Sequence, residues 1–180
     1  MCGTDLSLCA VRTPLACRRE VAGFSTPEAC VPVETDVCAT FILMNLPEIL
    51  AELRDLNEPV PKPLRLPTET EVDLAETALG VKFPADYRQY LLEAGDVVFG
   101  ALEPAVVTPD AGYLSLVEVA ESAWDEMELP RDLLPFCEDN GDYYCLAADG
   151  TVKFWSHNGT TDESWPDLAT WIKEVWIDEG

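Results

Sequence analysis

Apolar residues recur at helical spacing in several separate stretches of the chain. From Asn45 to Leu56 the leucines and an isoleucine fall three or four residues apart, and this spacing predicts an amphipathic helix. The same periodicity predicts further helices over about residues 68–79, 85–94, 115–127 and 164–176. Each of these helices has one apolar face that must be covered by the rest of the protein.

Capping residues mark the ends of these stretches. Thr68 and Glu71 have the spacing of a capping box, in which a hydroxyl and a carboxylate each bond an amide of the first helical turn. Glycine ends helices readily because it adopts the left-handed conformation without strain. The expected N-caps are Asn45, Thr68, Ser115 and Ser164, and the expected left-handed glycine stops are Gly80 and Gly95.

The pattern changes to short apolar runs in two regions between the helical stretches. Asn140-Gly141 and Asp149-Gly150 are dipeptides that favour tight hairpin turns, and they separate three of the runs. Two further runs, at 97–99 and 105–107, are bounded by glycine and proline and predict strands near a sheet edge. The three runs expected to form an antiparallel meander are 133–137, 143–147 and 152–155.

Turns of two residues can join only antiparallel neighbours, because a parallel pair needs a long crossover connection. The helical stretches fall before and after the strands, rather than alternating with them. The predicted fold class is therefore α+β, with a twisted antiparallel β-sheet and helices packed mainly on one face.

Residues 1–43 differ from the rest of the chain. They show neither helical periodicity nor strand alternation, and they contain five of the seven cysteines. Met44 directly precedes the first helical stretch, so we interpret it as the natural initiator. We expect residues 1–43 to be a leader that is disordered or a wrongly assigned start, and residues 44–180 to form a single domain.

The chain is strongly acidic, with 34 Asp and Glu against 11 Lys and Arg and a formal net charge of -23. Such a charge repels nucleic-acid backbones and anionic membrane surfaces, so neither is an expected partner. The charge either serves solubility alone or attracts a basic protein. No apolar run approaches the length of a membrane span and no secretory signal is recognisable, so we expect a cytoplasmic protein.

Candidate catalytic chemistry is sparse. The single histidine, His157, has no recognisable nucleophile beside it, and Cys137 and Cys145 fit a role as buried apolar residues. Three carboxylates, at Glu138, Asp139 and Asp142, surround one turn, but the spacing of a calcium loop is absent. The sequence therefore predicts no enzymatic activity, no metal and no cofactor.

Two blocks of residues carry a family resemblance. The first reads E-x-x-L-G-x-x-F-P-x-D-Y-x-x-Y-L over residues 76–91, and the second combines L-P-F at 134–136, N-G-D-Y-Y-C-L at 140–146 and V-x-F-W-x-H at 152–157. Over about residues 66–176 the chain resembles the SUKH superfamily of Smi/Knr type. It departs from the family pattern at Ala94-Gly95-Asp96, where Asn-Gly-Gly is usual.

The resemblance implies the same α+β fold and a bacterial immunity protein that neutralises a secreted polymorphic toxin, often a nuclease. Related fungal members resemble regulatory hub proteins, so a regulatory or scaffold module that binds an endogenous protein is the alternative. An enzyme based on the clustered carboxylates is a third, weaker hypothesis. For a basic toxin domain as partner, the predicted contact residues are Asp96, Glu103, Asp139, Asp142 and Tyr143, because turns around a sheet can present several carboxylates to one surface.

Overall fold

The computed structural model describes residues 44–159 and 161–179. The leader expected at residues 1–43 lies outside these described residues. Helices in the described part are α1 (Leu46–Asp55), α2 (Glu69–Leu79), α3 (Ala85–Ala94), α4 (Leu116–Glu126) and α5 (Leu168–Trp171), with a 3-10 turn η1 (Gly112–Leu114) and a π-helix η2 (Ile172–Ile177). The strands are β1 (Glu103–Pro104), β2 (Leu133–Asp139), β3 (Asp142–Ala147), β4 (Val152–Trp155) and β5 (Ser164–Trp165).

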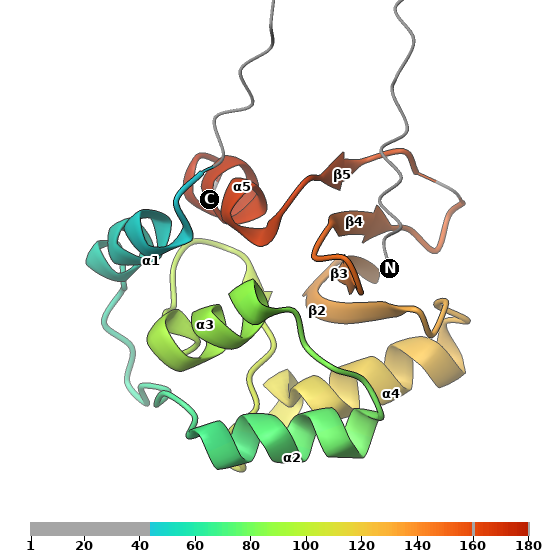
Figure 1. The fold of residues 1–180 in the computed structure, drawn as a ribbon, viewed down its shortest axis with the longest axis horizontal. Coiled ribbons are helices and arrows are strands. Elements are labelled where there is room, and N and C mark those ends of the chain that lie inside the picture. The colour runs from blue at the N-terminus through green and yellow to red at the C-terminus, as the bar shows by residue number, and fades with distance from the viewer. Residues whose placement is uncertain (1–43, 160, 180) are drawn as a thin grey trace, which may run out of the picture. The chain divides into compact units, whose positions relative to one another are not determined.

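The strands form one antiparallel sheet whose order follows the chain, β1-β2-β3-β4-β5. Figure 1 labels four of them, β2 to β5. Asn140 and Gly141 join β2 to β3 with φ values of 54° and 87°, and Gly150 before β4 has a φ of 90°. These are the positive φ values that the turn dipeptides predicted. The α+β class and the central antiparallel meander are confirmed, and the sheet gains one short strand at each edge.

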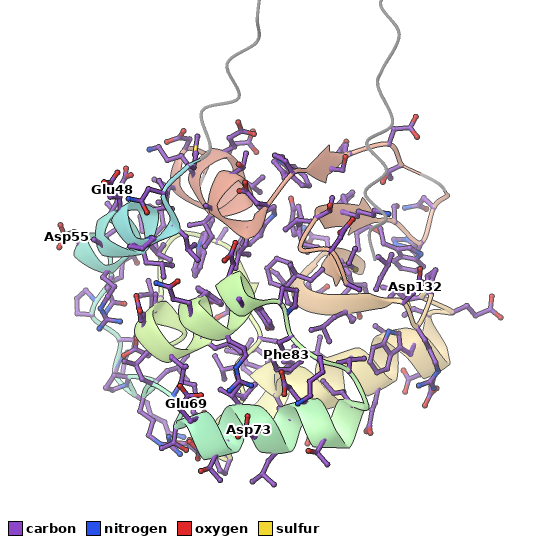
Figure 2. All side chains as sticks on the ribbon, viewed as in Figure 1. Glu48, Asp55, Glu69, Asp73, Phe83 and Asp132 are labelled. Atoms are coloured by element: carbon purple, nitrogen blue, oxygen red, sulfur yellow. The ribbon has the colours of Figure 1, made fainter. Side chains whose placement is uncertain are left out.

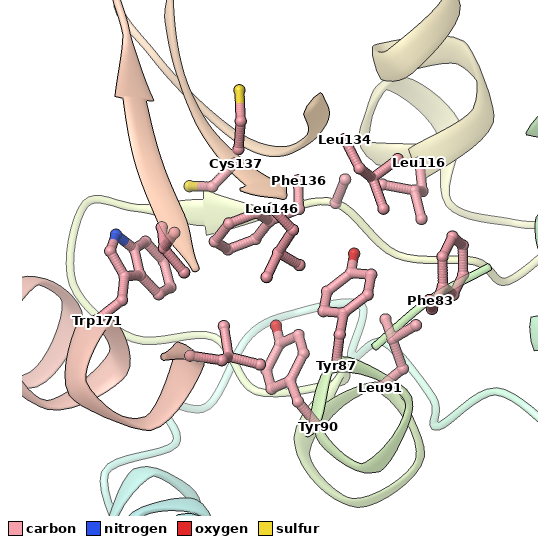
Figure 3. Packing of buried hydrophobic residues seen from close by; sticks show 14 of the residues in the cluster. Phe83, Tyr87, Tyr90, Leu91, Leu116, Leu134, Phe136, Cys137, Leu146 and Trp171 are labelled. Carbon is pink, nitrogen blue, oxygen red and sulfur yellow. The ribbon is translucent and has the colours of Figure 1, made fainter. Parts of the chain in front are cut away.

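The core lies where α3 and α5 meet the sheet. The ring of Phe136 on β2 lies 4.8 Å from Trp171 of α5 and 5.7 Å from Tyr87 of α3, measured between ring centroids. Trp171 also contacts Tyr144 of β3 at 5.2 Å. Figure 3 shows Tyr87 and Trp171 reaching Phe136 from two different helices. Aromatic packing thus joins elements that are far apart in the sequence.

The last helix changes its winding to bury two tryptophans. Trp171 and Trp176 are five residues apart and almost completely buried, with exposed fractions of 1% and 0%. Side chains five apart diverge around an α-helix, whereas a π-helical turn brings them close to one face. The segment from Ile172 to Ile177 adopts this π-helix. The indole N–H of Trp176 donates to the Phe99 carbonyl at 3.0 Å. This hydrogen bond holds the loop between α3 and β1 against the last helix.

Helix α4 protects the edge of β2 that β1 leaves open. β1 pairs only with Glu138 and Cys137, near the end of β2. At the other end of the strand, the indole N–H of Trp124 on α4 donates to the Leu133 carbonyl at 2.9 Å. Exposed strand edges invite pairing with other chains, so this side chain both satisfies the carbonyl and covers the edge.

A buried carboxylate holds α2 and α3 together. Glu76 is 3% exposed, and one of its oxygens accepts from the backbone N–H of Phe83 at 2.9 Å. Lys82 and Arg88 approach the same carboxylate at 2.5 and 3.2 Å. Burial favours the neutral acid, but these three donors outweigh it and lower the pKa of Glu76. Glu76, the first residue of the family motif, therefore holds the turn between α2 and α3 in place.

The predicted capping box of α2 is present with both hydrogen bonds. The Thr68 hydroxyl accepts from the Glu71 backbone N–H, and the Glu71 carboxylate accepts from the Thr68 backbone N–H at 2.8 Å. Arg65 adds two hydrogen bonds to the same carboxylate, at 2.6 and 2.9 Å. The Arg65 guanidinium, followed by the Thr68 amide, lowers the pKa of Glu71 from 4.5 to about 2.

Stability should therefore depend on the charge of Glu71 in a defined pH window. The folded state binds this proton less tightly than the unfolded chain, so its contribution is full above about pH 4.5 and is lost as the pH falls toward 2. Urea unfolding should show wild type more stable than Glu71→Gln at pH 7, with the difference shrinking across that window. Glu48→Gln, which removes an exposed first-turn acid of α1, is the matched control for the loss of one charge. A pH-independent difference for Glu71→Gln would contradict this account.

Gly80 and Gly95 end helices for different reasons. Gly80 has a φ of 68° with open space around it, so it is the left-handed stop that the sequence predicted. Gly95 has a φ of -69°, and the prediction of a left-handed stop was wrong there. A Cβ at Gly95 would lie 2.5 Å from the Leu91 carbonyl oxygen, so the position requires a residue without a side chain.

Substitution should separate these two requirements. Gly80→Ala is expected to cost about 1 kcal/mol through backbone strain, and Gly80→Asn less, because asparagine tolerates the left-handed region. Gly95→Ala is expected to cost about 1 to 3 kcal/mol through the clash, and Gly95→Asn at least as much. Urea unfolding of the four variants measures both pairs. The explanation would be wrong if asparagine restored stability relative to alanine at Gly95 but not at Gly80.

Several sequence predictions were wrong in detail. Residues 97–99 form no strand, and 105–107 contribute only an isolated bridge from Val106 to Ser115. Ser164 is in β5 and does not cap the last helix, because Asp167 accepts from the Thr170 N–H instead. Asn45 precedes α1 without a side-chain capping bond. Among the described residues, none of the helices is both long and apolar enough to cross a membrane.

Candidate functional site

An open groove of about 590 Å³ lies where β1, the β2–β3 hairpin, η1 and α4 come together. Its lining combines four carboxylates, two tyrosines and small or aliphatic side chains, with no lysine or arginine among them. We call it the acidic groove; it is lined by Ala101, Leu102, Glu103, Ala105, Tyr113, Leu114, Glu118, Val119, Ser122, Glu138, Asp139, Asn140 and Tyr143.

The sheet register places two of the carboxylates side by side. Glu103 of β1 is the partner of Glu138 on β2, which in turn is the partner of Tyr143 on β3. Side chains of partner residues point to the same face of a sheet, and like charges directly opposite each other are destabilising. The strand register therefore makes Glu103 and Glu138 neighbours on one face of the sheet.

The hairpin turn fixes the carboxylates at the end of the groove. One oxygen of Glu138 accepts from the Gly141 backbone N–H at 2.6 Å. The amide of Asn140 donates to Asp139 at 2.7 Å, and Asp139 is the strand partner of Asp142 across the turn. Backbone geometry rather than long flexible side chains thus sets the positions of these acids.

Tyr113 stands at the rim of the groove. It is 73% exposed, which is unusual for so large an aromatic residue, and its hydroxyl lies 3.0 and 3.1 Å from the two carboxylate oxygens of Glu103. This hydrogen bond to Glu103 raises the pKa of Tyr113. Tyrosine is one of the residue types that most often anchor protein interfaces.

Tyr143 contributes to the wall of the groove and is itself buried, with 8% of its surface exposed. Burial raises the pKa of Tyr143, and the negative charge of Glu138 adds a smaller effect in the same direction, so the hydroxyl stays protonated at neutral pH. Its ring packs against Trp155 of β4 at a centroid distance of 6.0 Å. The strand pairing thus holds the ring in place.

The groove is built from residues that a family match also covers. The family profile SUKH_5, described as SMI1-KNR4 cell-wall, matches residues 46–177. The chain belongs to this SUKH family. The crystal structure of a protein from Pseudomonas syringae pv. tomato is similar to the SUKH domain at 42% identity and a TM-score of 0.69, covering 72% of this chain and 97% of that one. No curated protein sequence matches the chain significantly.

Two of the predicted contact residues of the SUKH domain have their carboxylates engaged elsewhere. Asp142 accepts from the His157 backbone N–H at 3.0 Å and from its Nδ1 at 2.6 Å. Burial opposes the effect, but the bonds from His157 outweigh it and lower the pKa of Asp142. Asp96 forms an ion pair of 2.8 Å with Arg54 and does not line the groove.

The structure brings the other three predicted residues, Glu103, Asp139 and Tyr143, into the acidic groove of the SUKH domain. Sequence reasoning missed Tyr113 and Glu118 and considered Glu138 only as a metal ligand. The alternation of β2 could have indicated that Glu138 shares a face with Tyr143, but nothing local to Tyr113 signals its position. Among the residues that the structure describes, no three His, Cys, Asp or Glu side chains are arranged to hold a metal ion.

Acidic side chains also occur on the SUKH domain far from the groove. Figure 2 labels Glu48 and Asp55 on α1 and Asp132 before β2, all of them exposed, whereas Phe83 is buried. Charge alone therefore does not distinguish the groove from the rest of the surface. Its distinguishing features are the hollow shape, the opposed glutamates and the two tyrosines.

Proposed function

We propose that this SUKH domain is a non-catalytic protein-binding domain, an immunity protein that neutralises a basic toxin domain through the acidic groove. The observation that carries the proposal is a groove that gathers four carboxylates and an exposed tyrosine without a single basic side chain in its lining. Such a surface accelerates encounter with a cationic partner, and the tyrosine offers an anchor that loses its water on binding.

The sign of the charge supports a protein partner. A formal net charge of -23 opposes contact with phosphate backbones and anionic lipid headgroups. A toxin that acts on nucleic acid carries a basic surface for its substrate, and an acidic protein can cover that surface. We therefore favour a nuclease as the toxin and the cytoplasm as the place of neutralisation.

The chemistry of the described nucleophiles supports binding over catalysis. Cys137 and Cys145 are buried, and burial raises the pKa of both thiols, which keeps them protonated and unreactive. His157 has its Nδ1 engaged by Asp142 and does not line the acidic groove. The groove itself contains carboxylates and hydroxyls that suit recognition of cations.

Co-expression tests this function. Each candidate toxin gene adjacent to the native gene is expressed in a bacterial host with and without this chain, and survival and complex formation are measured. We expect one toxin to be neutralised, with a complex that weakens as the salt concentration rises. Failure to rescue cells from every neighbouring toxin would refute the immunity function.

A regulatory or scaffold role is the second candidate. The description of the matched family refers to the cell wall and not to a toxin, and this favours an endogenous protein as partner. In that case the groove should capture a basic protein from the native host in the absence of any toxin gene. Loss of that complex when Glu138 is replaced by Gln would support this role.

A further inference from the structure

We propose that the acidic groove receives one arginine side chain of the partner, held between Glu103 and Glu138, hydrogen-bonded to the Tyr143 hydroxyl and stacked on the Tyr113 ring. The inference rests on the proposed function, since it names the chemical group that the same groove recognises. Four observations support it: the opposed carboxylates, the hydroxyl of a buried tyrosine, the exposed ring and the composition of the lining.

The opposed carboxylates offer a cation two acceptors on one face of the sheet. Glu103 and Glu138 are strand partners, and each has unused acceptor capacity beyond its bond to Tyr113 or Gly141. Ion pairs in the part of the chain that the structure describes use Arg54, Arg65, Lys82, Arg88, Arg131, His157 and Lys173, and none of these residues lines the groove. Within the described residues, no basic side chain supplies a compensating charge in the groove lining.

Tyr143 is an independent indication of a ligand. Its side chain is more than nine-tenths buried, it lines the groove, and within the described residues its hydroxyl makes no hydrogen bond. Because Tyr143 belongs to the lining of an open groove, its hydroxyl is within reach of a bound ligand. The hydroxyl oxygen can accept a hydrogen bond from a cation lying between the glutamates.

Tyr113 favours a planar cation. Its ring is 73% exposed, and the bond from its hydroxyl to Glu103 limits how far the ring can turn. A guanidinium stacks on such a ring while directing its five N–H groups outward in a plane. Carboxylates on two strands and a third acceptor at Tyr143 match this planar set of donors better than they match the compact ammonium group of lysine.

The test is a titration of the full chain, labelled with ¹⁵N, with acetyl-Gly-Arg-Gly-amide. The citrulline and lysine peptides of the same length serve as the neutral and the non-planar control. We expect saturable shifts at Tyr113, Glu138 and Tyr143 with the arginine peptide and none with citrulline. Tyr143→Phe, which removes one hydroxyl, should weaken binding by about 5-fold or more, since a hydrogen bond to a charged group is lost. Asp55→Asn should change binding by less than about 2-fold, because solvent screens an exposed charge.

Three results would overturn the inference: equal shifts with citrulline, non-saturating shifts spread over α1 and α2, or wild-type affinity in a folded Tyr143→Phe protein. If a toxin is neutralised in co-expression but the arginine peptide does not bind the groove, the arginine site is refuted and the immunity function stands. If the groove binds arginine as described but no toxin is neutralised, the site stands and the partner is of another kind.

Discussion

Replacing Glu76 with alanine is expected to destabilise the domain by about 2 to 4 kcal/mol, because it removes a buried carboxylate that three donors contact. The substitution leaves the backbone N–H of Phe83 unpaired in the core and removes the partner of Lys82 and one partner of Arg88. Because a domain of this size is stable by only about 5 to 15 kcal/mol, such a loss is large. Urea unfolding at pH 7 measures it.

Two further variants separate the parts of this network. Glu76→Gln keeps an oxygen for the Phe83 amide and should cost roughly half as much as alanine. Lys82→Met should cost about 1 kcal/mol or less, because the lysine side chain is 86% exposed and its pair is screened by water. The loss of stability caused by Glu76→Ala should diminish below about pH 4.5. The lowered pKa of Glu76 means that the fold stabilises its ionised form, and protonation removes that form. A loss under 0.5 kcal/mol for Glu76→Ala would show that the clamp is dispensable.

Neutralising both opposed glutamates is expected to weaken binding of the cognate toxin by about 100-fold, since each close interfacial charge pair contributes about 1.5 kcal/mol or more. The double variant is Glu103→Gln with Glu138→Gln. The salt dependence of binding should fall as well, because fewer ions are displaced from the interface. Isothermal titration calorimetry at two salt concentrations measures both effects.

The matched control changes the same amount of charge outside the groove. Asp55→Asn with Asp132→Asn removes two exposed carboxylates of α1 and of the segment before β2. This pair should alter affinity by about 3-fold or less, because exposed charges away from an interface act only through a screened field. Equal losses in the two double variants would mean that the overall charge, and not the groove, attracts the partner.

The helices were predictable because their signals are local. Spacing of three and four residues buries Leu50 and Leu53 of α1, and the Thr68–Glu71 capping box is complete within one turn. The hairpin at Asn140-Gly141 was equally readable, since positive φ is a property of those two residues. Local chemistry could not predict the π-helix, which forms where Trp171 and Trp176 must both reach the core.

The candidate site was only partly predictable because its members come from distant parts of the chain. Asp139 and Tyr143 lie near one turn, so their proximity followed from the sequence. Asp142 has the same local setting, yet its carboxylate is bonded to His157 on a later loop. Asp96 follows a helix as expected, but Arg54 of α1 pairs with it.

The sequence by itself determined the SUKH motif, the α+β class, the Thr68–Glu71 capping box, the hairpin and the strong negative charge, since each depends on neighbouring residues or on composition. Only the tertiary structure decided that Glu103 lies opposite Glu138, that Tyr113 stands beside them, and that Glu76 is buried. The physical reason is that strand register and helix packing are settled by the whole core at once. A residue pair separated by tens of positions carries no local mark of its contact.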